Sequence, residues 1–225
     1  MERSKIILIR MFQIALVVSA IGLSSGCQSK LTKEARAGIN CVSINTELPM
    51  PNAISYGSLA GASTWWGGVA SLAGKQRRVE GGRAIIAIMR ENDINPSKIL
   101  ATQFKEQLEA KQVFPCIVRA GGDASFTFEI WSRLMWDSSG VSWPPYPLVP
   151  ELTAVVYLKK PDGTLIWKND KTFHWKKGTF FYDSTSEVDA YMHNEYIENP
   201  SLLRKGFEQA ASNIVGKFLG NIEVN

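Results

Sequence analysis

The stretch FTFEIWSRLMW, residues 126–136, decides the fold of this chain because it alternates apolar and polar side chains. Its even-numbered positions supply one apolar face, formed by Phe126, Phe128, Ile130, Leu134 and Trp136. A period of two residues is typical of a half-buried strand. The alternation returns in LTAVVYL (152–158), and the turn residues KPDG (160–163) lead from it into TLIW (164–167). We therefore predict three consecutive strands within 126–175, the last two of which form a hairpin.

Two amphipathic helices are predicted to cover one face of this sheet. Asn95-Pro96 and Asn199-Pro200 each place a capping residue before a proline at the first helical position, which is a helix start signal. Apolar residues then recur at three-and-four spacing, through Lys111 in the first helix and to Gly220 in the second. Two further strands are predicted, at 39–48, which contains Cys41-Val42-Ser43-Ile44-Asn45, and at 113–119, which has Cys116 near its start. Because a half-buried sheet needs an amphipathic cover, we predict an α/β (α+β) fold, with a mixed sheet of about four to five strands and both long helices on one face.

Composition and charge place the chain among ordinary globular proteins. It has 225 residues, of which 45% are hydrophobic and 20% are charged. The formal charge is +4, and the first 26 residues contribute +2 of it through Arg3, Lys5 and Arg10 against Glu2, which leaves +2 for the remainder. Such a balance gives no sign of the clustered basic face that nucleic-acid binding requires.

The first 27 residues have the order of an export signal. Basic residues precede an uncharged run over 11–23, and Ser24-Ser25-Gly26 supply a small-residue processing site. The uncharged run is too short to span a bilayer comfortably. The sequence LSSGC (23–27) resembles the lipobox of bacterial lipoproteins, in which the cysteine receives a diacylglycerol thioether and the new amino terminus is acylated. Ser24 stands where leucine is commonest in that family, and the alternative is an ordinary secretory signal.

The lipobox resemblance implies boundaries and an address for the mature protein. Residues 1–26 would be the signal peptide, and Cys27 would be the lipidated residue that anchors the protein to a membrane. The polar residues of 27–38 suit a tether that holds the domain off the bilayer, and 39–225 are predicted as one domain with a Gly-rich helical insert at 53–92. By resemblance to lipoprotein sorting in enteric bacteria, Gln28 implies the outer membrane, on its periplasmic side.

The insert contains a stretch, Tyr56–Gly74, that has no charged residue and carries five glycines around Trp65-Trp66. Three interpretations stay open: a glycine-rich helix packed on the domain, a contact with the membrane or a partner through the paired tryptophans, or a flexible loop. Arg77 and Arg78 belong to a basic cluster beside it. They are either part of a solvated helix end or a contact for anionic headgroups.

Cys41 and Cys116 are the thiols that remain if Cys27 is lipidated. Both lie near the beginnings of predicted strands, and a pair of cysteines outside the inner membrane is permitted to oxidise. The alternatives are a disulfide and two buried thiols that pack as small apolar groups. Strand order decides between them, and it does not follow from the sequence.

The order of elements resembles a family of small, mostly uncharacterised periplasmic lipoproteins. Their α/β domain is similar to the TolB amino-terminal domain and to the domain of the curli-secretion lipoprotein. The features that carry the resemblance are Tyr56–Gly74, the helix Pro96–Lys111, the strand Leu165-Ile166-Trp167 after Pro161-Asp162-Gly163, and Asn199-Pro200. The resemblance implies a non-enzymatic module that is attached to a membrane and makes protein contacts.

No pattern in the chain specifies a reaction, so we expect no enzyme, no cofactor and no metal site. Ser139 with His174 or His193 would be the candidates for a hydrolase, but no G-x-S-x-G motif is present. We expect a binding or scaffolding module for other envelope components, in particular for another envelope protein. The alternative is a receptor or carrier for a lipid or another apolar ligand. A closed apolar cavity would favour the ligand, and a flat exposed strip would favour a partner.

Overall fold

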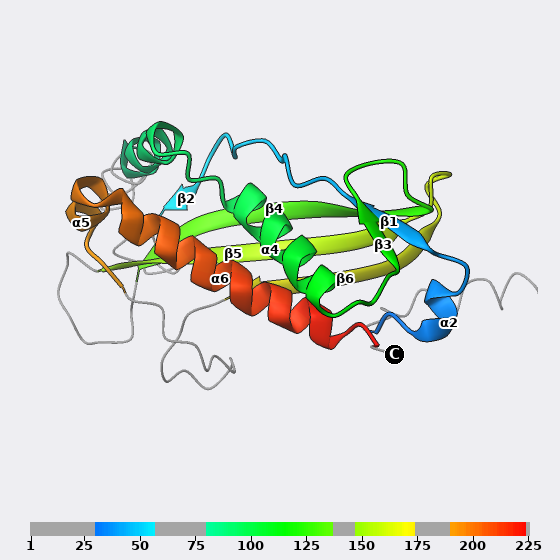
Figure 1. Cartoon of the computed structure of the whole chain (residues 1–225). Helices are drawn as coiled ribbons and strands as arrows, with labels where there is room; N and C mark the ends of the chain where they lie inside the picture. The colour runs from blue at the N-terminus through cyan, green and yellow to red at the C-terminus, as the bar shows by residue number, and fades with distance from the viewer. Residues whose placement is uncertain (1–29, 57–79, 137–146, 174–189, 224–225) are drawn as a thin grey trace, which may run out of the picture.

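The computed structural model describes residues 30–56, 80–136, 147–173 and 190–223 (Figure 1). Its strands are β1 (Cys41–Ile44), β2 (Ser55–Tyr56), β3 (Cys116–Val118), β4 (Ala124–Trp136), β5 (Leu148–Lys159) and β6 (Leu165–Phe173). They form a mixed sheet in the order β3-β1-β4-β5-β6, and β2 also pairs with β4. Two long helices, α4 (Pro96–Ala110) and α6 (Pro200–Gly220), lie side by side across one face. The predicted fold class is confirmed.

The three strands β4, β5 and β6 form the predicted antiparallel meander. β4 and β5 are in continuous register from Ser125 opposite Lys159 to Trp136 opposite Leu148. Phe126 and Leu134 are buried beneath the helices, whereas Thr127 and Glu129 on the alternate face are exposed. The turn into β6 has Gly163 at φ 86°, a backbone conformation that favours glycine. Binary alternation therefore fixed both the strands and the face that each one buries.

The parallel part of the sheet is shorter than the sequence predicts. β1 pairs in parallel with both β3 and β4, and it covers four residues of the predicted run 39–48. The side chain of Asn45 accepts a hydrogen bond from the Glu47 N–H at 3.0 Å, and this local turn competes with the sheet and ends the strand. β3 ends before a turn in which Gly121 has φ 82°.

The two long helices begin where the sequence predicts, at Pro96 and Pro200. The side chain of Asn95 accepts hydrogen bonds from the N–H groups of Ser97 and Lys98, at 3.0 and 3.2 Å. Asn199 does not act in this way, because its side chain accepts from the hydroxyl of Ser201 instead of a backbone N–H. The expectation that both asparagines cap their helices is thus correct for α4 and wrong for α6.

The core fills the space between the sheet and the two helices, and a helical segment over 80–91 adds Ile85 and Met89 to it. A short helix, α5 (His193–Glu198), closes the core at one end of α6. Its Tyr196 is fully buried, and the phenol donates a hydrogen bond to the carbonyl oxygen of Leu148 at 2.8 Å. The sequence predicts an irregular loop over 180–199. Burial of this one tyrosine against β5 orders the loop's last part.

Alanine substitutions at Gly206 and Gly216, two glycines of α6, are expected to change the free energy of unfolding in opposite directions. A Cβ on Gly206 would lie 2.5 Å from Cγ of Pro150 in β5, whereas a Cβ on Gly216 would meet nothing within 4 Å. Because the proline ring is rigid, Gly206→Ala is expected to lower the free energy of unfolding by about 1–3 kcal/mol. Gly216→Ala is expected to raise it by about 0.5–1 kcal/mol, since alanine is favoured over glycine inside a helix. Urea unfolding measures both changes, and changes of equal sign would contradict the packing of α6 on β5.

Candidate functional site

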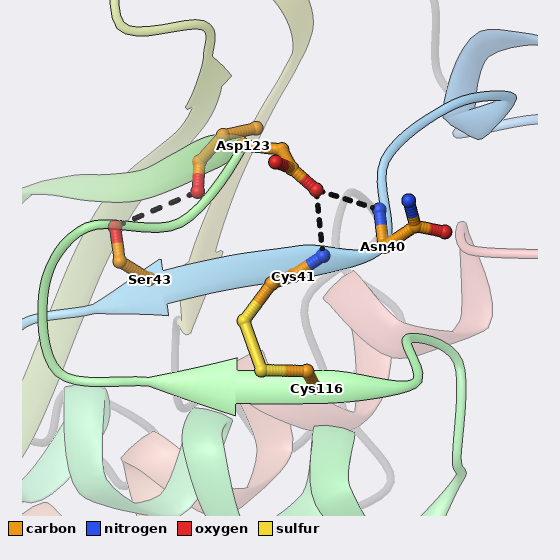
Figure 2. Close-up of a disulfide and its surroundings, with 6 residues drawn as sticks. Asn40, Cys41, Ser43, Cys116 and Asp123 are labelled. Atoms are coloured by element: carbon orange, nitrogen blue, oxygen red, sulfur yellow. Dashed lines mark hydrogen bonds between the residues drawn. A yellow bond between two sulfur atoms is a disulfide. The ribbon is translucent and has the colours of Figure 1, made fainter.

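Cys41 and Cys116 form a disulfide near the edge of the sheet (Figure 2). The two residues lie directly opposite each other in the parallel pairing of β1 with β3, with 4.4 Å between their Cα atoms. The bond joins positions 75 residues apart and ties the short edge strand β3 to β1. The strand order, which the sequence left open, is what brings the two cysteines together.

Asp123 fastens the start of β1 beside the disulfide (Figure 2). Its Oδ2 accepts hydrogen bonds from the backbone N–H groups of Asn40 and Cys41, both at 2.9 Å. These donors, that of Cys41 first, hold the pKa of the Asp123 carboxyl below its ordinary value. The preceding Gly122 approaches β1 so closely that a Cβ would lie 2.7 Å from the Cys41 carbonyl oxygen. This role of Asp123 is not predicted from the sequence, where Gly121-Gly122-Asp123 between two predicted strands is the available signal.

The lowered pKa of Asp123 predicts a stabilising contribution that depends on pH. A carboxyl whose pKa is lower in the folded than in the unfolded state stabilises the fold above its unfolded pKa of about 3.9. That contribution is lost as the pH falls through the folded pKa. The wild type is therefore expected to exceed Asp123→Asn in stability at pH 7, and the difference is expected to shrink below about pH 4. Urea unfolding at a series of pH values measures it, and a difference that stays constant with pH would contradict the role of the charge.

The segment before the sheet is part of the domain. Leu31 is fully buried, its N–H donates to the Asn221 carbonyl at 2.7 Å, and the Glu223 N–H donates to the Leu31 carbonyl at 3.1 Å. Helix α2 (Lys33–Arg36) follows, and the side chain of Thr32 accepts from a backbone N–H of its first turn. The predicted tether over 27–38 is thus folded from Leu31 onward. A lone leucine in a polar stretch gave no periodic signal for this contact.

Arg36 fixes α2 against two distant parts of the chain. Its side chain is buried, and the guanidinium donates to the carbonyl oxygens of Val113 and Glu223, both at 2.7 Å. The same group lies 5.7 Å from the centre of the Phe114 ring. A buried charge is stable only when such donors find acceptors. The start of the domain is therefore held to the carboxyl end of α6 and to the connection between α4 and β3.

The sheet face opposite the long helices carries aromatic and charged side chains. Trp131 is 47% exposed, and Tyr157 on the neighbouring strand is half-buried. The ammonium groups of Lys159 and Lys168 lie 4.7 and 5.5 Å from the centre of the Tyr157 ring. Burial, and then the hydrogen bond with Glu129, raises the pKa of Tyr157. Among the described elements no helix covers this outer sheet face, which consists of Thr127, Glu129, Trp131, Thr153, Val155, Tyr157, Lys168 and Asp170.

A groove of about 320 Å³ lies between α4 and α6, and eight of its nine lining residues are polar or charged. Arg204 crosses one side of it and donates to the carbonyl oxygens of Asn92 and Asp93, at 2.7 and 3.2 Å. Gln103 crosses the other side and donates to the carbonyl oxygen of Glu208 at 3.2 Å. These bonds join the helices at the surface. A groove of this chemistry does not suit a lipid or another apolar ligand.

Several residues singled out from the sequence lie outside the described residues. They are Cys27, Trp65, Trp66, Arg77, Arg78, Ser139 and His174. β2 and the helical segment 80–91, which stand on either side of residues 57–79 in the sequence, lie at the same end of the domain as α5 (Figure 1).

His193 lies at the start of α5, and its burial lowers the pKa of the imidazole. In the described ranges no group of three His, Cys, Asp or Glu side chains is arranged to hold a metal ion. The expectation that the protein has no metal site stays a prediction. None of the helices in these ranges is both long and apolar enough to cross a membrane.

The chain was compared with family models, curated proteins and solved structures. No family model and no curated protein matches the chain. Among solved structures, a minor lipoprotein from Acinetobacter baumannii matches with a TM-score of 0.32 and 15% identity, over 56% of this chain and 86% of that one.

Proposed function

We propose that this protein is a lipid-anchored envelope protein whose domain binds or scaffolds other envelope components without catalysing a reaction. The observation that carries the binding role is the outer sheet face, on which Trp131 is 47% exposed and Tyr157 lies two same-face residue pairs further along the pairing of β4 with β5. Large aromatic side chains at the centre of a flat, partly charged surface are typical of contacts between proteins. The partner we propose is therefore another envelope protein.

The anchor in this proposal is Cys27 within LSSGC. Several acyl chains on one cysteine hold a protein to a bilayer effectively permanently, because each buried methylene contributes about 0.8 kcal/mol. Gln28 supports a location at the outer membrane, on its periplasmic side, through the resemblance to lipoprotein sorting. The paired Trp65-Trp66 and the basic Arg77 and Arg78 remain proposed contacts for the membrane or a partner.

A receptor for an apolar ligand is the second candidate, and the groove between α4 and α6 does not favour it. Such a protein needs an enclosed pocket lined by apolar side chains. The groove between α4 and α6 is lined by charged groups such as Lys98, Glu106 and Arg204 instead. The outer sheet face, with the exposed Trp131 and the half-buried Tyr157, fits a partner surface better.

Two experiments test the proposal. For the anchor, Cys27→Ala is expected to move the protein from the membrane fraction to the soluble fraction, and mass spectrometry of the wild-type amino terminus is expected to show acylation. A Cys27→Ala variant that stays in the membrane fraction, as the wild type does, would overturn lipidation at Cys27.

For the partner, the wild-type protein is treated with a mild crosslinker in intact cells, and its crosslinked products are identified. Trp131→Lys is expected to abolish a specific product. Ile197→Lys serves as the matched control, because Ile197 is 44% exposed but lies on α5, away from the outer sheet face. Equal crosslinking of both variants would overturn the outer sheet face as the binding surface.

A further inference from the structure

The point at which the chain enters the folded domain is fixed at Leu31. This residue is fully buried and pairs with Ile222 in a parallel bridge next to the carboxyl end of α6. Two residues later, the Lys33 N–H donates to Oε2 of Glu223 at 3.1 Å. With Arg36 bonded to the carbonyl of Glu223, four successive contacts hold the segment against the end of α6. A lipid attached before Leu31 therefore connects to a rigid body at that residue.

Very little chain separates this point from the proposed lipid. Cys27 and Leu31 are four residues apart, so their Cα atoms are separated by about 14 Å at most, even in a fully extended chain. The acyl chains of Cys27 would lie in the hydrocarbon, which places its backbone in the headgroup layer. That layer is itself about 5–8 Å thick. The remaining reach is too small to hold a folded domain clear of the bilayer.

We infer that one end of the domain, the anchor end, lies directly against lipid headgroups. The anchor end consists of residues 30–36 with α2, the last turn of α6 with residues 221–223, and residues 109–115 at the end of α4 and in its connection to β3. The inference rests on the proposed lipidation of Cys27 and deepens it, because it assigns the surface that faces the membrane. The opposite end, with α5, β2 and the helical segment 80–91, points away from the bilayer (Figure 1). Because Arg77 and Arg78 come just before that segment in the sequence, this orientation favours a partner over the membrane as what they contact.

The chemistry of the anchor end fits a phospholipid surface. Its exposed lysines are Lys30, Lys33, Lys111 and Lys217, and its acidic residues are Glu34, Glu109 and Glu223. The carboxylate of Glu109 is paired with Lys105 at 3.6 Å, and that of Glu223 accepts the backbone N–H of Lys33. Lysine ammonium groups on flexible stems can reach headgroup phosphates. Among the described residues these segments expose no large apolar side chain, and Leu165, 51% exposed at the start of β6, stands at the same end of the sheet (Figure 1). The lysines of these segments suit contact with headgroups.

The orientation also places the outer sheet face. The 21 residues of α6 extend about 32 Å from α5 to the anchor end. The long strands β4, β5 and β6 run along the same direction beneath it (Figure 1). The outer sheet face would therefore stand upright on the membrane and be open from the side to an envelope partner.

Two matched positions on α6 test the orientation. Lys205 and Lys217 are both exposed and twelve residues apart, which corresponds to about 18 Å along the helix. Each is changed singly to cysteine in the full-length lipidated protein and labelled with a thiol-reactive fluorophore. Cys41 and Cys116 do not compete for the label, because they are bonded to each other. The protein is reconstituted into vesicles of phosphatidylethanolamine and phosphatidylglycerol that carry a nitroxide on the headgroup. Quenching at Lys217→Cys is expected to be severalfold stronger than at Lys205→Cys. Equal quenching, or stronger quenching at Lys205→Cys, would overturn the orientation.

A linker variant tests whether tether length is the cause. Twenty Gly and Ser residues inserted between Lys30 and Leu31 raise the typical reach to about 25 Å or more. Quenching at Lys217→Cys is then expected to fall to the level of Lys205→Cys, and quenching that persists would overturn the short tether as the cause. Failure of the anchor is distinguishable from failure of the orientation. Wild-type protein that carries no acyl chain and does not sediment with vesicles overturns both proposals, whereas lipidated, sedimenting protein with equal quenching overturns only the orientation.

Discussion

Phe104→Ala is expected to lower the free energy of unfolding by about 3–5 kcal/mol. Phe104 is fully buried on α4, and its ring centre lies 5.1, 5.3 and 6.3 Å from those of Phe126, Phe128 and Phe218. All three contacts are edge-to-face. They join both long helices to the central strand, so removal of the ring opens a cavity where three elements meet. Neighbouring aromatic rings cannot collapse into such a space without leaving their own contacts.

Urea unfolding of purified Phe104→Ala and wild type measures this loss. Leu165→Ala is the control, because Leu165 is 51% exposed at the start of β6, and its truncation is expected to change stability by less than about 0.5 kcal/mol. Similar effects of the two substitutions would contradict the central position of Phe104. Phe104→Leu, which fills part of the space, is expected to fall between Phe104→Ala and wild type.

Removal of the Cys41–Cys116 disulfide is expected to cost about 2–5 kcal/mol. The bond closes a loop between residues 75 apart in sequence, and chain entropy alone gives about 4.5 kcal/mol for a loop of this length. Without the bond, β3 keeps only three residue pairs with β1 at the edge of the sheet. The unfolded chain would meanwhile gain the freedom that the bond had removed.

The double variant Cys41→Ala and Cys116→Ala tests this prediction against reduced wild type. Both are expected to unfold at a similar, lower urea concentration, and the reductant is expected to have no further effect on the variant. A wild type whose unfolding does not respond to reductant would contradict a stabilising disulfide in solution.

The local sequence pattern was sufficient to predict the elements whose structure depends on residues close to them in the chain. The period of two in 126–136 and 152–158 gave β4 and β5, and Asn95-Pro96 gave the start of α4, because these signals depend on neighbours within a few residues. The same reasoning overestimated the length of β1, since the turn at Asn45 ends the strand inside the predicted segment 39–48. It also missed α5, whose order depends on the bond from Tyr196 to β5.

The sequence by itself determined the α/β (α+β) class, the face that each long strand buries, and the helices that cover it. Only the tertiary structure decided that β1 lies between β3 and β4, which sets Cys41 opposite Cys116, and that Leu31 belongs to the core. The physical reason is that these contacts join residues 75 or more positions apart, so no local periodicity carries them. The same contacts place the start of the domain four residues after Cys27, and the proposed orientation on the membrane follows from that spacing.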